Sequence, residues 1–434
     1  MAKYEPKWDL ASLYPGGSRS AELEKLLRET ESAIEETDRS LRALPPEPGE
    51  ALVRAILDLQ ALAERLSEAI DFIECLEAEN VADEIAGQLM GRAQKMSARR
   101  ATLQTRLEQR FLAADDASWK KLLADERLAG VAFAMNEARE TARIKMAPEM
   151  EMLAEELATD GYHAWGRLYE KIAGKLRVEF EEDGKKTTLS MGQLHNKLES
   201  PDRKVRKRAF EKMEEAWSGV ADLAAIALNS QAGYRLSLYK NRGWESVLRE
   251  PLRMGRVRPE TLDAMWGAVA EESGRLVPYL NAKARLLGLD RLAWYDLPAP
   301  VGAADRRFTY DQAAEFILEH FGRFSPGLRD FARTAFEKRW IEAEDRPGKR
   351  AGGFCTDLPL HGETRIFMTF GGTYGSVSTL GHELGHAYHS WIVKDLPFWA
   401  TQYPMTLAET ASTFCETIIS DAALGAASGE RERL

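Results

Sequence analysis

The sequence lacks the features that mark secreted, membrane-spanning or nucleic-acid-binding proteins. It has only three cysteines in 434 residues (Cys75, Cys355 and Cys415), too few and too widely spaced for a disulfide framework. No apolar run approaches the roughly 20 residues of a membrane span, and the N-terminus MAKYEPKWDL has no apolar signal segment. The net charge of -10 argues against nucleic acid or an anionic membrane as the main partner. We therefore expect a cytoplasmic protein with reduced cysteines.

The residues that are present predict a mainly helical fold. Apolar residues make up 44% of the chain, enough for a large core. Between Glu50 and Glu79 there is no glycine or proline, and apolar residues recur every three or four positions, as on one face of a long helix. Similar patterns predict helices over 21–44, 81–112 and 259–287. Because 50–79 and 81–112 are joined by a short connection, we expect them to form an antiparallel hairpin.

Two places in the sequence indicate β-structure. Alternating apolar residues from Leu176 to Leu189, with Asp183-Gly184 between them, predict a short hairpin. Short strands are predicted again at 352–355 and 364–370 and would form a small antiparallel sheet. We divide the chain into an N-terminal helical hairpin domain (1–115), a helical segment with the β-hairpin (116–200) and a third domain (201–434).

A basic cluster follows Pro201 and is itself followed by acidic residues. Arg203, Lys204 and Arg206 to Arg208 precede Glu211, Glu214 and Glu215 at helical spacings of three and four. We interpret this segment as a solvated, ion-paired helix face; an anion-binding site is the alternative.

One motif carries chemistry: TLGHELGHAYH at 379–389 contains His-Glu-x-x-His. On a helix, residues four apart differ by about 40°, so His382 and His386 share a face and their imidazoles can converge on one zinc ion. Glu383 lies beside them, where it could reach a water molecule rather than the metal. Surface histidines on an ordinary helix are the alternative.

The motif segment also has features of a helix packed closely on a neighbour. Ser376 or Ser378 could cap it, and Leu380 and Leu384 form part of an apolar stripe. Gly381 and Gly385, four residues apart, would form a stripe without side chains and permit close approach of another backbone. The alternative is that the two glycines have no packing role and only weaken the helix.

A catalytic zinc site needs a third protein ligand and an open position. A second helix is predicted from 405, and Glu409 lies near its start among small apolar residues, where an unneutralised carboxylate would be costly. We expect Glu409 to be the third ligand. Glu416, two turns later, is the alternative and otherwise suits a supporting contact to a ligand. His389 suits a supporting or packing position, with ligation as its alternative.

The segment TRIFMTFGGTYGSVSTLGHELGHAYHSWIV at 364–393, followed by LAETASTFCE at 407–416, resembles the oligoendopeptidase F branch of the thimet-oligopeptidase-like zinc metallopeptidases. Softer similarities extend upstream, in WDL at 8–10, LYP at 13–15, SPDR at 200–203 and WYDL at 294–297. The resemblance implies a multi-helix peptidase fold. It also implies one Zn²⁺ per chain on His382, His386 and Glu409, with Glu383 as general base.

The resemblance further implies hydrolysis of internal bonds in short peptides. We expect the strand at 366–370 to expose an edge to an extended peptide, with Phe367, Met368, Thr369, Gly371 and Gly372 contributing to substrate binding. The cleavage-site preference and the oligomeric state are left open by the sequence.

The sequence departs from the family in one respect. Members of this family continue further and carry a His and Tyr cluster near their C-terminus, whereas only 25 residues follow Glu409 here and none is His or Tyr. We therefore expect an N-terminal portion of a longer enzyme, whose turnover on its own is in doubt. The alternatives are another zinc hydrolase, such as an aminopeptidase, and a zinc-binding but catalytically incomplete fragment.

Overall fold

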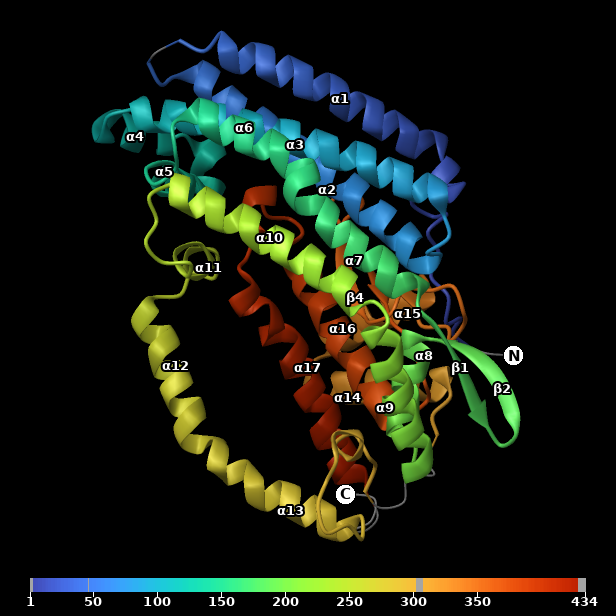
Figure 1. Ribbon diagram of the computed structural model, residues 1–434. Helices are drawn as coiled ribbons and strands as arrows, with labels where there is room; N and C mark the ends of the chain where they lie inside the picture. Colours follow the sequence, from blue (N-terminus) through green and yellow to red (C-terminus); the bar gives the residue numbers. More distant parts are fainter. Residues whose placement is uncertain (1–2, 46, 302–306, 428–434) are drawn as a thin grey trace.

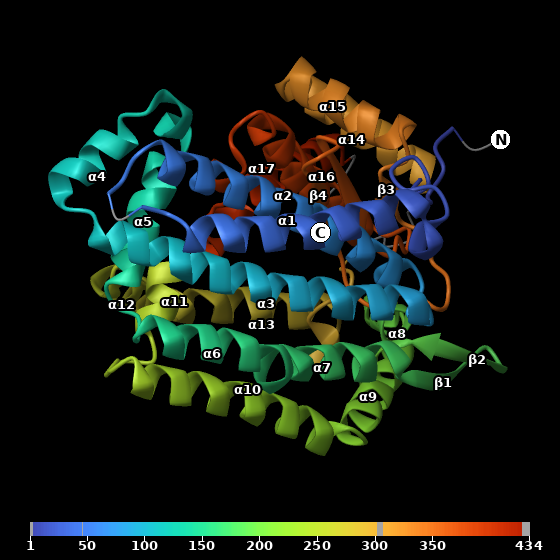
Figure 2. The same ribbon diagram turned by 90° about the horizontal axis from the view of Figure 1, so that it is seen from above.

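The computed structural model describes residues 3–45, 47–301 and 307–427, and it is mainly helical, as predicted. Three long helices of the N-terminal part lie side by side (Figure 2). The second and third of these helices, at 50–79 and 84–113, form the predicted helical hairpin. The N-terminal helices are α1 (Ala21–Arg42), α2 (Glu50–Glu79), α3 (Glu84–Ala113), α4 (Asp116–Leu123) and α5 (Ala132–Ala142).

The middle of the chain contains the predicted β-hairpin. Strands β1 (Arg177–Glu182) and β2 (Lys185–Ser190) pair antiparallel, and Asp183 and Gly184 take positive φ values of 52° and 76° in the turn between them. Positive φ at both positions matches the right-handed twist of the strands. The helices in this part of the chain are α6 (Pro148–Ala158), α7 (Ala164–Lys175), α8 (Met191–Asn196), α9 (Arg203–Ser218) and α10 (Ala221–Asn241), of which α8 and α9 contact the hairpin.

After the short helix α11 (Arg249–Met254), two helices form an arm on the outside of the molecule (Figure 1). They are α12 (Pro259–Glu272) and α13 (Leu276–Leu286), and we call them the α12–α13 arm. The prediction of one helix over 259–287 is wrong, because a 3-10 turn at Ser273–Arg275 separates the two. Helix α12 has no buried residue and α13 buries only Ala284.

The last part of the structure combines four helices with a three-stranded sheet. The helices are α14 (Tyr310–Phe324), α15 (Pro326–Glu337), α16 (Tyr374–Val393) and α17 (Met405–Ala426). The strands are β3 (Ile341–Glu342), β4 (Phe354–Leu358) and β5 (Glu363–Phe367), in the order β3-β5-β4. The antiparallel β4–β5 pair was predicted, whereas the short parallel strand β3 was not.

The strand order corrects one expectation about the substrate. Strand β5 lies in the centre of the sheet, and the amides of Met368 and Phe370 donate to the carbonyls of Glu342 (2.8 Å) and Ala343 (2.9 Å). The prediction of a free edge at 366–370 is therefore wrong at Ile366 and Phe367, which pair with β3 on one side and with β4 on the other. Among the described residues, β4 is the strand at the edge of the sheet nearest α16.

Two large apolar cores organise the molecule. The first fills the N-terminal helices and includes Leu358 and Phe367 of the sheet, so it runs across the predicted boundary between the first and third domains. The second joins α14, α15, α16 and α17 to the sheet. The proposed division into three domains stays a prediction. Within the described residues, none of the helices combines the length and apolar character needed to cross a membrane.

Candidate metal centre

Helix α16 contains the His-Glu-x-x-His motif and turns its apolar side toward the second core. Its N-cap is Thr373, whose Oγ1 accepts from the amide of Ser376 at 3.1 Å. The prediction of Ser376 or Ser378 as the cap is wrong, because the helix begins one turn earlier than the apolar pattern suggests. The predicted stripe is confirmed: Leu380 and Leu384 are fully buried.

Helix α17 packs directly against α16 (Figure 1). A Cβ atom placed on Gly385 would lie 2.6 Å from the carbonyl oxygen of Ala411 and 2.7 Å from Cα of Ser412. A Cβ on Gly381 would lie 2.9 Å from the Ile419 side chain. The predicted close approach of a backbone is therefore confirmed at Gly385, whereas Gly381 accommodates a side chain.

This packing brings three potential metal ligands together. Oε2 of Glu409 lies 3.1 Å from Nε2 of His382 and 3.3 Å from Nε2 of His386. Among the residues that the structure describes, ligand atoms of these three side chains lie within 4.8 Å of one another. The Glu409 side chain is 55% exposed, so one side of the cluster is open to solvent.

The chemical state of these groups suits a divalent cation. Burial lowers the pKa of His386, which favours the neutral imidazole that a metal needs. A hydrogen bond from Ser412 lowers the pKa of Glu409, which favours the carboxylate. Two imidazole nitrogens and one carboxylate oxygen form a donor set typical of catalytic zinc. These residues therefore fit a zinc ion.

Glu383 is the buried carboxyl group of the site, with 7% of its surface exposed. Burial, and to a lesser extent the negative charge of Glu409, raise the pKa of Glu383 to about 7, against the opposing effect of His382. Its Oε2 has no hydrogen-bond partner among the described residues. Its Oε1 lies 3.4 Å from the position that a Cβ on Gly353 would take, at the start of β4.

Glu416 contacts the other side of His382. Its Oε2 lies 3.2 Å from Nδ1 of His382, and its Oε1 accepts from Oγ of Ser378 at 3.3 Å. Nδ1 is the ring nitrogen that does not face Glu409. Glu416 is thus placed to orient the His382 ring rather than to bind the ion that His382, His386 and Glu409 would hold.

His389 lies one turn beyond His386 and packs on Tyr403, with 4.5 Å between ring centroids. Its Nδ1 is buried without a hydrogen-bond partner in the described part of the chain. His389 is not among the side chains whose ligand atoms converge.

The side chains expected to bind substrate fall into two groups. Phe367 and Met368 are 0% and 2% exposed, so a part in substrate binding would have to come from their main chains, and it stays a prediction. Thr369, Gly371 and Gly372 are partly exposed. The amide of Gly371 donates to Oγ of Ser376 at 3.0 Å, and the carbonyl of Gly372 accepts from the amide of Phe308 at 2.9 Å.

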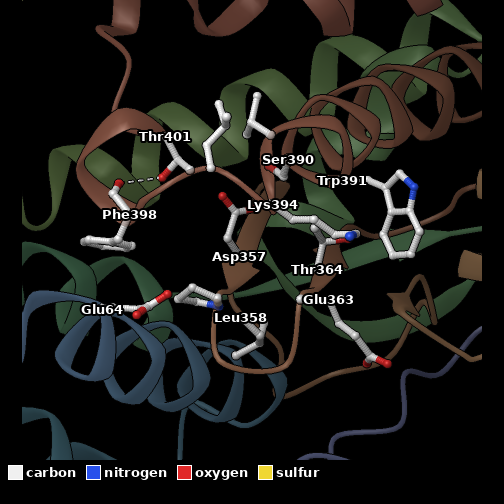
Figure 3. A pocket seen from close by; sticks show the side chains of 14 residues that line it. Glu64, Asp357, Leu358, Glu363, Thr364, Ser390, Trp391, Lys394, Phe398 and Thr401 are labelled. Carbon is white, nitrogen blue, oxygen red and sulfur yellow. Dashed lines mark hydrogen bonds between the residues drawn. The ribbon is translucent and has the colours of Figure 1, made fainter. Parts of the chain in front are cut away.

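A pocket lies at the end of β4 that is remote from Glu383 (Figure 3). Asp357 of β4 lines this pocket together with Ser390 and Lys394. Thr401 and Glu64 also line it. Burial raises the pKa of Asp357, against a hydrogen bond with Ser390. The metal ligands are not part of this pocket.

Ser412 is a contact that the sequence analysis missed. Its hydroxyl donates to Oε2 of Glu409 at 2.6 Å, and the residue is fully buried. A small polar residue three positions after a predicted ligand on the same helix was the available signal. Its burial depends on the distance between the two helices, which the sequence does not state.

Known proteins resemble this chain in sequence and in fold. Oligoendopeptidase F of Lactococcus lactis subsp. cremoris is 27% identical over 255 residues, which are 58% of this chain and 42% of that protein. The chain thus spans less than half the length of this curated relative. The structure of oligoendopeptidase F from Enterococcus faecium matches 95% of this chain and 69% of its own, with a TM-score of 0.66 and 18% identity. A proposed oligoendopeptidase F of Bacillus anthracis matches 92% and 71%, with a TM-score of 0.76 and 15% identity.

Two family profiles also match the chain. The profile described as oligopeptidase F matches residues 110–177. The profile of peptidase family M3 matches residues 197–432, which are more than half of the chain and include the whole candidate metal centre. The chain belongs to peptidase family M3.

Proposed function

We propose that this chain carries the catalytic zinc site of an oligopeptidase that hydrolyses internal bonds of short peptides. The observation that carries the proposal is the convergence of His382, His386 and Glu409, with Oε2 of Glu409 within 3.3 Å of both Nε2 atoms. These three side chains would hold one zinc ion. A bound zinc ion would polarise the scissile carbonyl and lower the pKa of the attacking water.

Glu383 is the proposed general base. Burial raises its pKa toward the pH at which a base both accepts and returns a proton efficiently. The unpartnered Oε2 accepts a proton from the attacking water as the new C–O bond forms. Glu383 then passes the proton to the amine nitrogen that leaves when the C–N bond breaks.

The free edge of β4 is the proposed place for the substrate. Among the described residues this strand pairs with β5 on one side only, and Gly353 just before it lies against Glu383. An extended peptide could add to this edge through main-chain hydrogen bonds. Asp357 and the pocket of Figure 3 would lie further along the same strand, where they could receive a terminal part of the peptide.

Zinc content and peptide cleavage test the proposal together. We expect about one zinc per chain, lost in His382→Ala and weakened in Glu409→Gln. Glu383→Gln should keep zinc and lose at least about 100-fold in hydrolysis. Full zinc content in His382→Ala would contradict the proposed zinc site. Loss of zinc in Glu383→Gln but not in Glu409→Gln would show that the roles of the two glutamates are the reverse of those proposed.

The choice of peptide separates the alternatives. An internally quenched peptide with a blocked N-terminus should be cleaved as well as the same peptide with a free N-terminus. Cleavage of the free form alone would indicate an aminopeptidase. Bound zinc without cleavage of either peptide would indicate the zinc-binding but catalytically incomplete fragment and contradict the proposed activity of this chain alone.

A further inference from the structure

Glu409 depends on another residue for its position because its own side chain is largely exposed. A glutamate has three side-chain torsions, and at 55% exposure few packing contacts restrict them. The carboxylate nevertheless meets both Nε2 atoms, at 3.1 Å and 3.3 Å. A contact with a neighbouring group must therefore favour this rotamer of Glu409 before a metal ion binds.

Ser412 is the group in contact with that carboxylate from the protein interior. Its Oγ lies 2.6 Å from Oε2 of Glu409 and 3.1 Å from the Glu409 carbonyl oxygen. A hydroxyl has one proton to donate, and the shorter contact to the charged oxygen is the stronger one. Oε2 retains a second lone pair, so it can accept from Ser412 and still face the histidines.

The position of Ser412 is set by contact between the two helices. Ser412 is fully buried. Its Cα lies 2.7 Å from the point where a Cβ of Gly385 would be, so only the absence of that side chain lets the two backbones meet here. Gly385 directly precedes His386 in the sequence. The same contact therefore fixes the hydroxyl relative to the histidine face of α16.

We propose that Ser412 is a positioning residue for Glu409, which holds the carboxylate against His382 and His386 before a metal binds and so increases zinc affinity. This inference rests on the proposed zinc site. Residues that orient a metal ligand typically change affinity by roughly 10- to 100-fold when they are altered. We expect an effect near the lower end, because Ser412 makes a single hydrogen bond to the ligand.

The test measures the zinc dissociation constant of the full chain by competition with a chromophoric chelator. Ser412→Ala should bind zinc about 10-fold more weakly than the wild type. Thr413→Ala is the matched control, because within the described part of the chain Oγ1 of Thr413 donates only to the main-chain carbonyl of Glu409, at 2.5 Å. Its affinity should stay within about twofold of the wild type.

A second pair of variants separates the hydroxyl from packing. Ser412→Thr and Ser412→Val add the same volume beside Gly385 and differ in the hydroxyl alone. We expect the threonine variant to bind zinc about 10-fold more tightly than the valine variant. Thermal unfolding of the metal-free proteins would report any packing damage, which both variants share.

The outcomes distinguish a failure of the proposed zinc site from a failure of the proposed role of Ser412. A wild-type protein that binds no zinc contradicts the proposed function. Zinc binding that is equal in the wild type and Ser412→Ala overturns the role of Ser412 and leaves the zinc site standing. Equal affinity in the threonine and valine variants, both weaker than the wild type, assigns Ser412 to packing and also overturns the inference.

Discussion

Two pairs of consecutive helices in this molecule behave in opposite ways. Helices α16 and α17 pack so closely that a Cβ on Gly385 would lie 2.6 Å from the backbone of α17. The α12–α13 arm has glycines too, but a Cβ on Gly267 or Gly274 would meet nothing within 4 Å. Together the two helices of the arm bury a single residue.

The comparison shows what a helix–helix contact contributes to the candidate site. In the α16–α17 pair, close contact of backbones brings a carboxylate of one helix to two imidazoles of the other. In the arm, apolar side chains such as Trp266 (60%) and Leu276 (62%) remain exposed. A closely packed neighbour thus brings the candidate ligands together in one helix pair, whereas the helices of the arm leave large apolar side chains exposed.

Gly385→Ala should have the largest effect on the contact between α16 and α17. The new Cβ would overlap main-chain atoms of Ala411 and Ser412, so α17 would have to move away from α16. We expect unfolding free energy to fall by about 1–3 kcal/mol, and zinc affinity to fall at least about 100-fold as Glu409 moves from the histidines. Chemical denaturation and chelator competition measure the two effects.

Gly267→Ala in the arm is the control for this substitution. Because space around Gly267 is open, alanine should be neutral or stabilising by up to about 1 kcal/mol through its helix propensity. Unchanged zinc affinity in Gly385→Ala would show that the distance between α16 and α17 does not set the site.

Asp296→Asn should weaken the contact between α9 and the segment that follows the arm. Asp296 is fully buried and pairs with Arg203 (2.8 Å) and with Arg206 (3.0 Å), which is itself only 2% exposed. Burial raises its pKa, but hydrogen bonds from Arg203, the Ala293 amide and Arg206 outweigh this and leave the pKa at about 2. We expect unfolding free energy at pH 7 to fall by about 2 kcal/mol.

The pH dependence gives this prediction its sign. The pKa of Asp296 is lower in the folded state than the ordinary value of about 3.9. Its contribution is therefore fully present above about pH 5 and is lost as the pH falls through 4 toward 2. Urea unfolding of the wild type and the variant should differ most at pH 7 and least near pH 2. A constant difference would contradict a charge effect.

Glu416→Gln should have a smaller effect, confined to the metal site. It replaces the carboxylate on Nδ1 of His382 by an amide and keeps its size. We expect zinc affinity to fall about 10-fold with little change in stability. Thr417→Ala, at an exposed position of the same helix, should leave chelator competition unchanged. A wild-type zinc affinity in Glu416→Gln would show that the Glu416 carboxylate does not contribute to metal binding.

The smallest expected effect concerns the arm's surface. Because Trp266 and Val269 are 60% and 51% exposed on a helix without buried residues, we expect concentration-dependent self-association. Sedimentation velocity should show the double variant Trp266→Ser, Val269→Ser to associate less than the wild type.

Local patterns in the sequence determined much of the helical scaffold and the face of the motif. Helix α2 begins at Glu50 and ends at Glu79 as predicted, because its apolar period and its flanking residues are local properties. That His382 and His386 share a face follows from helix geometry alone. The prediction of Glu409 needed one further assumption, that two consecutive helices pack with the second helix lying across the motif.

Which distant segments are neighbours depends on the folded arrangement of the whole chain. The central place of β5 depends on β3, a two-residue strand whose pairing is long-range and leaves almost no local pattern. The basic cluster was expected to be a solvated face, but Arg206 is buried on Asp296, 90 residues away. The buried hydroxyl of Ser412 likewise exists because α17 approaches Gly385. Burial and pairing depend on which distant segment fills the adjacent space, and local periodicity carries no information about that segment.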